Sequence, residues 1–139
     1  MSNYKSVKKF HDKFEIPRKD KPDFLKPDEM RFRIDFLQEE LNELRDATYD
    51  SDLELAFDSL IDLVWVALGT ADMMGITEEI WDEGFNEVSR ANLSKERAEG
   101  ADDSRSKRKH SLDIIKPEGW TGPDLVKILN KYIKPQTED

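Results

Sequence analysis

The 139-residue sequence contains no cysteine, which excludes a disulfide framework and any thiolate metal site. It also lacks long hydrophobic runs. No uninterrupted apolar stretch approaches the roughly 20 residues that a membrane-spanning helix needs, so we expect no membrane partner. The first apolar residues are scattered among lysines and do not form the apolar core of a signal peptide. We therefore expect a cytoplasmic protein.

A basic stripe is lacking as well. The net charge is -9, and residues 28–62 account for all of it, with twelve acidic side chains against three basic ones. A protein that binds a nucleic-acid polymer through its phosphates usually presents clustered lysine and arginine. We therefore expect no nucleic-acid polymer as a partner. An acidic block of this kind can face a phosphate ligand only if cations lie between the two.

The sequence shows no strand pattern and no internal repeat, whereas apolar residues recur at helical spacing in several segments. The expected helices cover residues 7–14, 27–47, 55–74 and 77–93, with a last short helix that begins at Pro123. These segments predict an all-α antiparallel bundle of four to five helices in a single domain of residues 1–139. Residues 94–122 are expected to form a long functional or mobile loop, and residues 134–139 a frayed tail.

The helix expected over residues 55–74 is apolar almost all the way round, which is typical of a helix buried inside a protein. It nevertheless carries Asp58 and Asp62, which are four residues apart and therefore share a face. An ionised carboxylate among apolar side chains is costly unless it is paired or binds a metal. We interpret the two aspartates as half of a metal site. A capping box at Ser51–Glu54 is expected to open this helix, and Gly75 to close it.

The preceding helix has an acidic face. Its expected core stripe consists of five apolar residues at alternating spacings of four and three: Met30, Ile34, Leu37, Leu41 and Leu44. The other side carries Glu39, Glu40 and Glu43 together with two phenylalanines. Because a merely solvated face has no need of phenylalanine, we expect the acidic face to look into a second packed layer or a cleft. The short connection near Asp50 makes the two carboxylate-bearing helices antiparallel neighbours.

Carboxylates without cysteine or histidine partners suit Mg²⁺ or Mn²⁺. Such ions are usually completed by waters and substrate phosphates, and they can acidify a water for attack on phosphorus. Two interpretations without catalysis are also open. The acidic face can belong to a helical interaction module with a basic partner, or the carboxylates can form a structural divalent-ion site. His11 lies on the apolar stripe of the first helix and is interpreted as a packed core histidine.

Four segments in order carry a resemblance to a known family: RFRIDFLQEELNEL, DSLIDLVWVALGTADMMGI, FNEVSRANLSK and KPEGWTGPDL. Over residues 8–130 the chain resembles the MazG-like and phosphoribosyl-ATP pyrophosphohydrolase-like group of all-α nucleoside triphosphate pyrophosphohydrolases. Glu39, Glu40 and Glu43 match the EExxE pattern of that group. The second segment departs from the common ExxD form, since Ser59 stands three residues before Asp62. The additional carboxylate is Asp58, as in phage-type members with paired aspartates.

The resemblance implies a reaction and a set of catalytic residues. Water would attack the α-phosphorus of a nucleoside triphosphate between the two helices, giving a nucleoside monophosphate and pyrophosphate, with a role in nucleotide-pool housekeeping. Glu39, Glu40, Glu43 and Asp62 would hold Mg²⁺ (or Mn²⁺) and supply the catalytic carboxylates. Asp58 would bind the metal either directly or through water.

The resemblance also implies substrate-binding residues later in the chain. Asn92 and Lys95 match substrate-facing positions, with Arg90 as a further candidate and Lys95 suited to a phosphate as a point charge. Lys116 and Trp120 would line the nucleotide end of the site. Two alternatives stay open here: Asn92 can instead cap a helix, and Trp120 can either stack on a base or pack the loop into the core.

The substrate and the assembly are open at this level. Deoxynucleotides (including a dUTP-type specificity), damaged nucleotides and phosphoribosyl-ATP are the rival substrates. The last is disfavoured because no concentrated basic cluster is present for a second phosphate arm. A helix that is apolar on all sides needs more cover than so small a chain easily supplies, which favours a homodimer or a dimer of dimers. The family implies the same assembly, often with sites that draw residues from two subunits.

Overall fold

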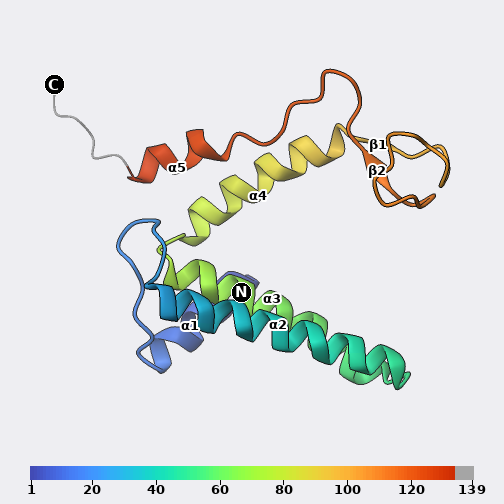
Figure 1. Ribbon diagram of the computed structural model, residues 1–139. Coiled ribbons are helices and arrows are strands. Elements are labelled where there is room, and N and C mark those ends of the chain that lie inside the picture. Colours follow the sequence, from blue (N-terminus) through green and yellow to red (C-terminus); the bar gives the residue numbers. More distant parts are fainter. Residues whose placement is uncertain (134–139) are drawn as a thin grey trace, which may run out of the picture. The chain divides into compact units, whose positions relative to one another are not determined.

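The computed structural model describes residues 1–133, and in that range it contains five helices and one two-stranded sheet (Figure 1). The elements are α1 (Asn3–Lys13), α2 (Pro27–Tyr49), α3 (Leu53–Met73), α4 (Glu78–Leu93), β1 (Glu96–Arg97), β2 (Ile114–Ile115) and α5 (Leu125–Ile133). The expected all-α class is confirmed. The frayed tail expected at residues 134–139 lies outside the described residues. Within these limits, none of the helices is long and apolar enough to cross a membrane.

Internal contacts divide the chain into two compact units, one comprising Met1–Trp81 and the other beginning at Asp82. Each unit is described by itself. The first holds α1, α2 and α3 together with the predicted carboxylate residues. The second holds most of α4, the small sheet and α5, together with the predicted substrate-binding residues.

Local signals in the sequence determine most helix ends in the first unit. Pro27 stands in the first turn of α2, where its missing N–H is not needed. The side chain of Asp52 accepts a hydrogen bond from the Leu55 backbone N–H at 3.0 Å and caps α3. The capping residue is therefore Asp52 and not the predicted Ser51, which takes the left-handed conformation at φ 54°. Gly75 follows α3 with φ +77°, as predicted for a left-handed helix end.

The core of the first unit lies between α1 and the second half of α3. Tyr4 and Val7 on α1 are buried against Leu68 and Ala71 on α3, and Trp65 packs against this cluster. Helix α1 starts earlier than the predicted residue 7, because the Ser2 side chain accepts a hydrogen bond from the Lys5 backbone N–H and caps it. The extra turn brings Tyr4 into the core.

Helices α2 and α3 form an antiparallel hairpin (Figure 1), as the short connection predicted. The predicted core stripe of α2 is wrong at two positions, since Ile34 is 58% exposed and Leu41 is 49% exposed. The buried residues of α2 are Arg33, Glu40 and Ala47, which follow one another at intervals of seven. Arg33 can be buried because α3 offers it two hydrogen-bond acceptors, Thr70 Oγ1 and the Val66 carbonyl.

The second unit contains a hairpin that the sequence analysis missed. Strands β1 and β2 pair antiparallel with Glu96 opposite Ile115 and Arg97 opposite Ile114, so the prediction of no strand is wrong. A two-residue strand is too short to show an alternating pattern. Asp113, directly before β2, is buried and accepts hydrogen bonds from Ser106 Oγ and Arg108 Nη1, each at 2.7 Å. These contacts give part of the predicted loop a defined structure.

Candidate active site

Three carboxylates from two helices converge in the α2–α3 hairpin. Glu40 and Glu43 lie one turn apart on α2, and Asp62 lies on α3. One oxygen from each of the three lies within 4.8 Å of the others. Glu40 is only 8% exposed, whereas Glu43 and Asp62 are half-buried. The structure therefore brings together residues from both predicted carboxylate groups.

Burial and the neighbouring negative charges raise the pKa values of two carboxyl groups in this cluster. Burial raises the pKa of Glu40 to about 7, with further contributions from a hydrogen bond to Glu43 and the charges of Glu43, Asp62 and Glu39. Burial also raises the pKa of Asp62, and the charges of Asp58 and Glu43 add to this effect. A bound cation would favour the ionised form of each carboxylate and reverse both shifts.

The residues present fit a divalent metal ion. Glu40 Oε2 is buried and has no hydrogen-bond partner among the described residues, although a buried carboxylate oxygen is normally satisfied. The donors are hard oxygens with no sulfur or imidazole nitrogen in the set, which suits Mg²⁺ or Mn²⁺. Three protein oxygens leave coordination positions for waters and phosphate oxygens, as Mg²⁺ sites in enzymes commonly do.

The other two predicted metal residues lie outside this group of three. Glu39 and Asp58 are both exposed, and neither contributes an oxygen to the cluster. Both are near it, since the charge of Glu39 raises the pKa of Glu40 and the charge of Asp58 raises the pKa of Asp62. The predicted five-residue set therefore separates into three converging carboxylates and two peripheral ones.

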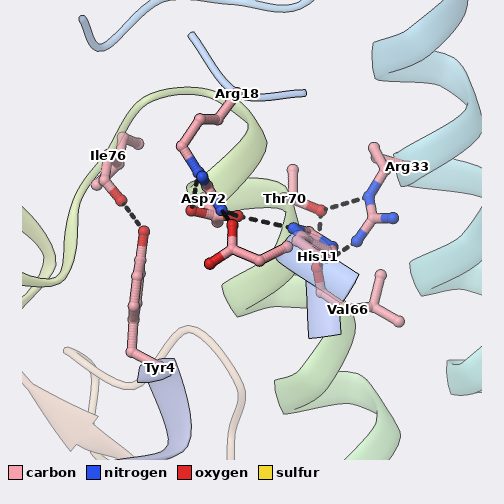
Figure 2. Close-up of polar contacts among 9 residues, drawn as sticks. Tyr4, His11, Arg18, Arg33, Val66, Thr70, Asp72 and Ile76 are labelled. Carbon is pink, nitrogen blue, oxygen red and sulfur yellow. Dashed lines mark hydrogen bonds and ion pairs between the residues drawn. The ribbon is translucent and has the colours of Figure 1, made fainter. Parts of the chain in front are cut away.

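A second buried polar group joins α1 to α3 (Figure 2). His11 Nδ1 lies 2.7 Å from Asp72 Oδ2, and Arg18 Nε donates to Asp72 Oδ1 at 2.9 Å. Burial by itself raises the pKa of Asp72, but hydrogen bonds from Arg18 and His11 outweigh it and hold the pKa below its usual value. The burial of His11 confirms its interpretation as a core histidine. Sequence analysis missed Asp72, although a lone carboxylate near the end of an apolar helix was a usable signal.

Arg33 joins α2 to α3 through hydrogen bonds. Sequence analysis missed this residue as well. Its Nε donates to Thr70 Oγ1 and its Nη2 to the Val66 carbonyl, both at 3.0 Å (Figure 2). Gly69 makes room for this arrangement. A Cβ atom at Gly69 would lie 2.8 Å from Arg33 Nη2 and 3.2 Å from the His11 ring. The spacing of α2 gave no signal for Arg33, because its partners Thr70 and Val66 lie on α3.

In the second unit, three predicted substrate residues gather around one indole ring. Trp120 Nε1 donates to the Ala91 carbonyl at 2.7 Å, which ties the half-buried ring to α4. Lys95 Nζ lies 5.1 Å from the centre of the Trp120 ring, and Lys116 Nζ lies 5.0 Å from it. Both distances fall within the range of a cation–π contact. Two ammonium groups are thus held on one rigid aromatic support.

The remaining two predicted substrate residues lie on α4. Arg90 is bound to Glu87 Oε1 through Nη2 at 2.8 Å, and the same Nη2 donates to the Gly122 carbonyl at 3.2 Å. Arg90 therefore holds the segment after Trp120 against α4. Asn92 is exposed in the last turn of α4.

The family model for phosphoribosyl-ATP pyrophosphohydrolase matches residues 7–92, which is more than half of the chain. The chain belongs to this family. The phosphoribosyl-ATP pyrophosphohydrolase family is part of the MazG-like all-α nucleoside triphosphate pyrophosphohydrolase superfamily, so the predicted resemblance is confirmed. No curated protein matches the chain.

Membership implies a pyrophosphohydrolase that acts on a nucleotide, and members of the family typically depend on a divalent metal. The matched region includes all three converging carboxylates. It ends at Asn92, so Lys95, Lys116 and Trp120 lie beyond it.

Proposed function

We propose that the chain hydrolyses a nucleoside or deoxynucleoside triphosphate at the α–β phosphoanhydride, releasing a nucleoside monophosphate and pyrophosphate in nucleotide-pool housekeeping. Mg²⁺ is the proposed cofactor, and Mn²⁺ its substitute. The observation that carries the proposal is the convergence of Glu40, Glu43 and Asp62 around a buried carboxylate oxygen without a partner. An acidic interaction module would instead present its charges on the surface, where a basic partner can reach them.

The carboxylates have different roles in the proposed reaction. Glu40, Glu43 and Asp62 hold the metal, with Asp58 and Glu39 acting at its edge. When bound, Mg²⁺ neutralises phosphate charge and lowers the pKa of a water molecule. Water oxygen bonds to the α-phosphorus while the bond from that phosphorus to the bridging oxygen breaks. Pyrophosphate leaves, and a carboxylate of the acidic set accepts the proton of the water.

The second unit supplies the proposed nucleotide contacts. Lys95 and Lys116 bind phosphate oxygens as point charges, supported by the Trp120 ring on which both are held. Asn92 contacts the nucleotide from the end of α4. Arg90 contributes by keeping the Trp120 segment against the helix, through its bond to the Gly122 carbonyl.

We also propose that the chain works as a homodimer or a dimer of dimers. The α2–α3 hairpin leaves several large apolar residues exposed in the described chain: Ile34, Leu41, Phe57, Leu60, Ile61 and Val64. Extended exposed apolar surface on a small protein is typical of an interface between protein chains. A second copy of the chain would cover this surface.

A nucleotide panel tests the activity. Standard and damaged nucleoside and deoxynucleoside triphosphates, dUTP included, are incubated with the protein and Mg²⁺, and monophosphate and pyrophosphate are quantified. Phosphoribosyl-ATP belongs in the panel as the second candidate substrate, because the matching family is named after the hydrolysis of this compound. We expect equimolar monophosphate and pyrophosphate from at least one nucleotide, and none with a metal chelator. Release of orthophosphate alone, or no turnover of any substrate, would contradict the proposal.

A further inference from the structure

Ser59 on α3 is fully buried, and its hydroxyl has no hydrogen-bond partner among the described residues. A buried serine or threonine inside a helix can satisfy its hydroxyl by bonding to the carbonyl four residues earlier. In the same hairpin, Thr48 does this with the Leu44 carbonyl at 2.9 Å, and Thr70 with the Val66 carbonyl at 2.7 Å. Burying an unpaired hydroxyl costs free energy, and alanine at position 59 would avoid this cost. The serine hydroxyl is therefore expected to have a function.

The direction of Ser59 follows from helix geometry. Val66 and Thr70 come seven and eleven residues later and therefore return to nearly the same line along α3. Both of these residues contact Arg33 of α2, one through its carbonyl and the other through its side chain. The line of α3 that carries Ser59 accordingly faces α2.

The position of Ser59 along the hairpin follows from the antiparallel pairing. Arg33 lies opposite Val66 and Thr70, and nearer the connection between the helices Asp62 meets Glu40 and Glu43. Ser59 stands one turn closer to that connection than Asp62 does. It therefore lies level with Glu43, at the end of the carboxylate cluster that is nearer the connection.

We propose that Ser59 Oγ is a neutral oxygen donor to the divalent cation held by Glu40, Glu43 and Asp62. The inference rests on the metal centre of the proposed function and adds a donor to it. Two buried side-chain atoms without partners, Ser59 Oγ and Glu40 Oε2, belong to this part of the hairpin. A neutral oxygen completes the coordination without a fourth negative charge, which leaves more of the charge of the cation for substrate phosphates.

The test is a Mn²⁺ titration of the full-length chain, with free Mn²⁺ measured by electron paramagnetic resonance. We expect Ser59→Ala to bind Mn²⁺ about tenfold more weakly than the wild type, which is the loss that follows removal of a group supporting a metal site. The same variant should unfold at an equal or higher temperature without metal, because it no longer buries an unpaired hydroxyl. Thr48→Ala is the matched control, since its hydroxyl is already bonded and exposed. Its Mn²⁺ affinity should equal that of the wild type.

Different failures separate this inference from the proposed function. If the wild type binds Mn²⁺ and Ser59→Ala binds it equally well, the inference on Ser59 is overturned and the metal centre stands. If Thr48→Ala loses as much affinity as Ser59→Ala, the inference is also overturned, because the loss is then not specific to the site. A wild-type chain that binds no Mn²⁺ overturns the metal centre itself.

Discussion

His11 Nδ1 lies 2.7 Å from Asp72 Oδ2, and each of these two side chains is only 4% exposed. Arg18 reaches the same carboxylate from the segment that follows α1. Asp72 therefore connects two parts of the chain to α3 through groups that are shielded from water. Such a site contributes little net stability compared with apolar packing, but it is costly to break because a charge is then left without a partner.

Asp72→Ala should destabilise the protein by about 3–5 kcal/mol, the usual cost of removing one partner of a buried ion pair. Urea-induced unfolding followed by circular dichroism measures this. Asp12→Ala is the control, since Asp12 is the other acidic partner of Arg18 but its side chain is 55% exposed. It should cost less than about 1 kcal/mol. Equal losses in the two variants would contradict a special role for the buried carboxylate.

Gly69→Ala should destabilise the protein by about 1 kcal/mol. The added methyl would lie 2.8 Å from Arg33 Nη2, and crowding of this kind costs about 1–3 kcal/mol, against a gain of about 1 kcal/mol in helix propensity. Gly84→Ala is the control, because its methyl would meet only Leu125 Cδ2 at an ordinary 3.8 Å. It should stabilise the protein by up to about 1 kcal/mol. Thermal unfolding of both variants measures these changes in stability. If both substitutions stabilise the protein, the close approach of Gly69 to Arg33 is contradicted.

Asp62→Asn should leave a folded protein whose Mg²⁺-dependent turnover is reduced at least about 100-fold, equivalent to about 2.7 kcal/mol of transition-state stabilisation. Glu39→Gln is the comparison, since Glu39 is exposed and contributes no oxygen to the cluster. It should lose less activity than Asp62→Asn. Steady-state kinetics by pyrophosphate release measures both, with circular dichroism as the check on folding. Near-normal turnover of Asp62→Asn would contradict the assignment.

The stabilising effect of Mg²⁺ should increase with pH. The pKa of Glu40 is raised to about 7, so the folded state holds a proton that the unfolded state has already released at lower pH. Without metal, this group makes the protein progressively less stable as the pH rises from about 4.5, its ordinary pKa, to about 7. Mg²⁺ takes the place of that proton and removes the loss. Melting curves at pH 5 and pH 8 check this, and an equal metal-induced shift at both values would contradict it.

Lys95→Met and Lys116→Met should each raise KM for the nucleotide about tenfold, which corresponds to the loss of one charged hydrogen bond of about 1.5 kcal/mol. Lys107→Met is the control, because Lys107 is an exposed lysine and is not one of the two lysines over the Trp120 ring. Its KM should not change. If KM changes equally in all three variants, the two lysines over the Trp120 ring have no specific part in nucleotide binding.

The sequence by itself determined most of the helices and the carboxylates from which the candidate site is built. Pro27 and Gly75 mark helix ends because their backbone properties act locally. The Thr77 hydroxyl accepts from the Ile80 backbone N–H at 3.4 Å at the start of α4, as its cap character predicts. Glu40, Glu43 and Asp62 belong to the carboxylate sets that helical spacing predicts, although the same spacing also included Glu39 and Asp58, which lie outside the cluster.

Only the tertiary structure decided which face of α2 is buried. Periodicity favoured the line of Ile34 and Leu41, yet the chain buries Arg33 and Glu40 instead. The reason is that burial of a polar group depends on partners from elsewhere in the chain, and Arg33 finds them in Thr70 and the Val66 carbonyl. Spacing within one helix carries no information about such partners. The same holds for Ser59. Only the packing of α2 against α3 shows that its hydroxyl is buried without a hydrogen-bond partner.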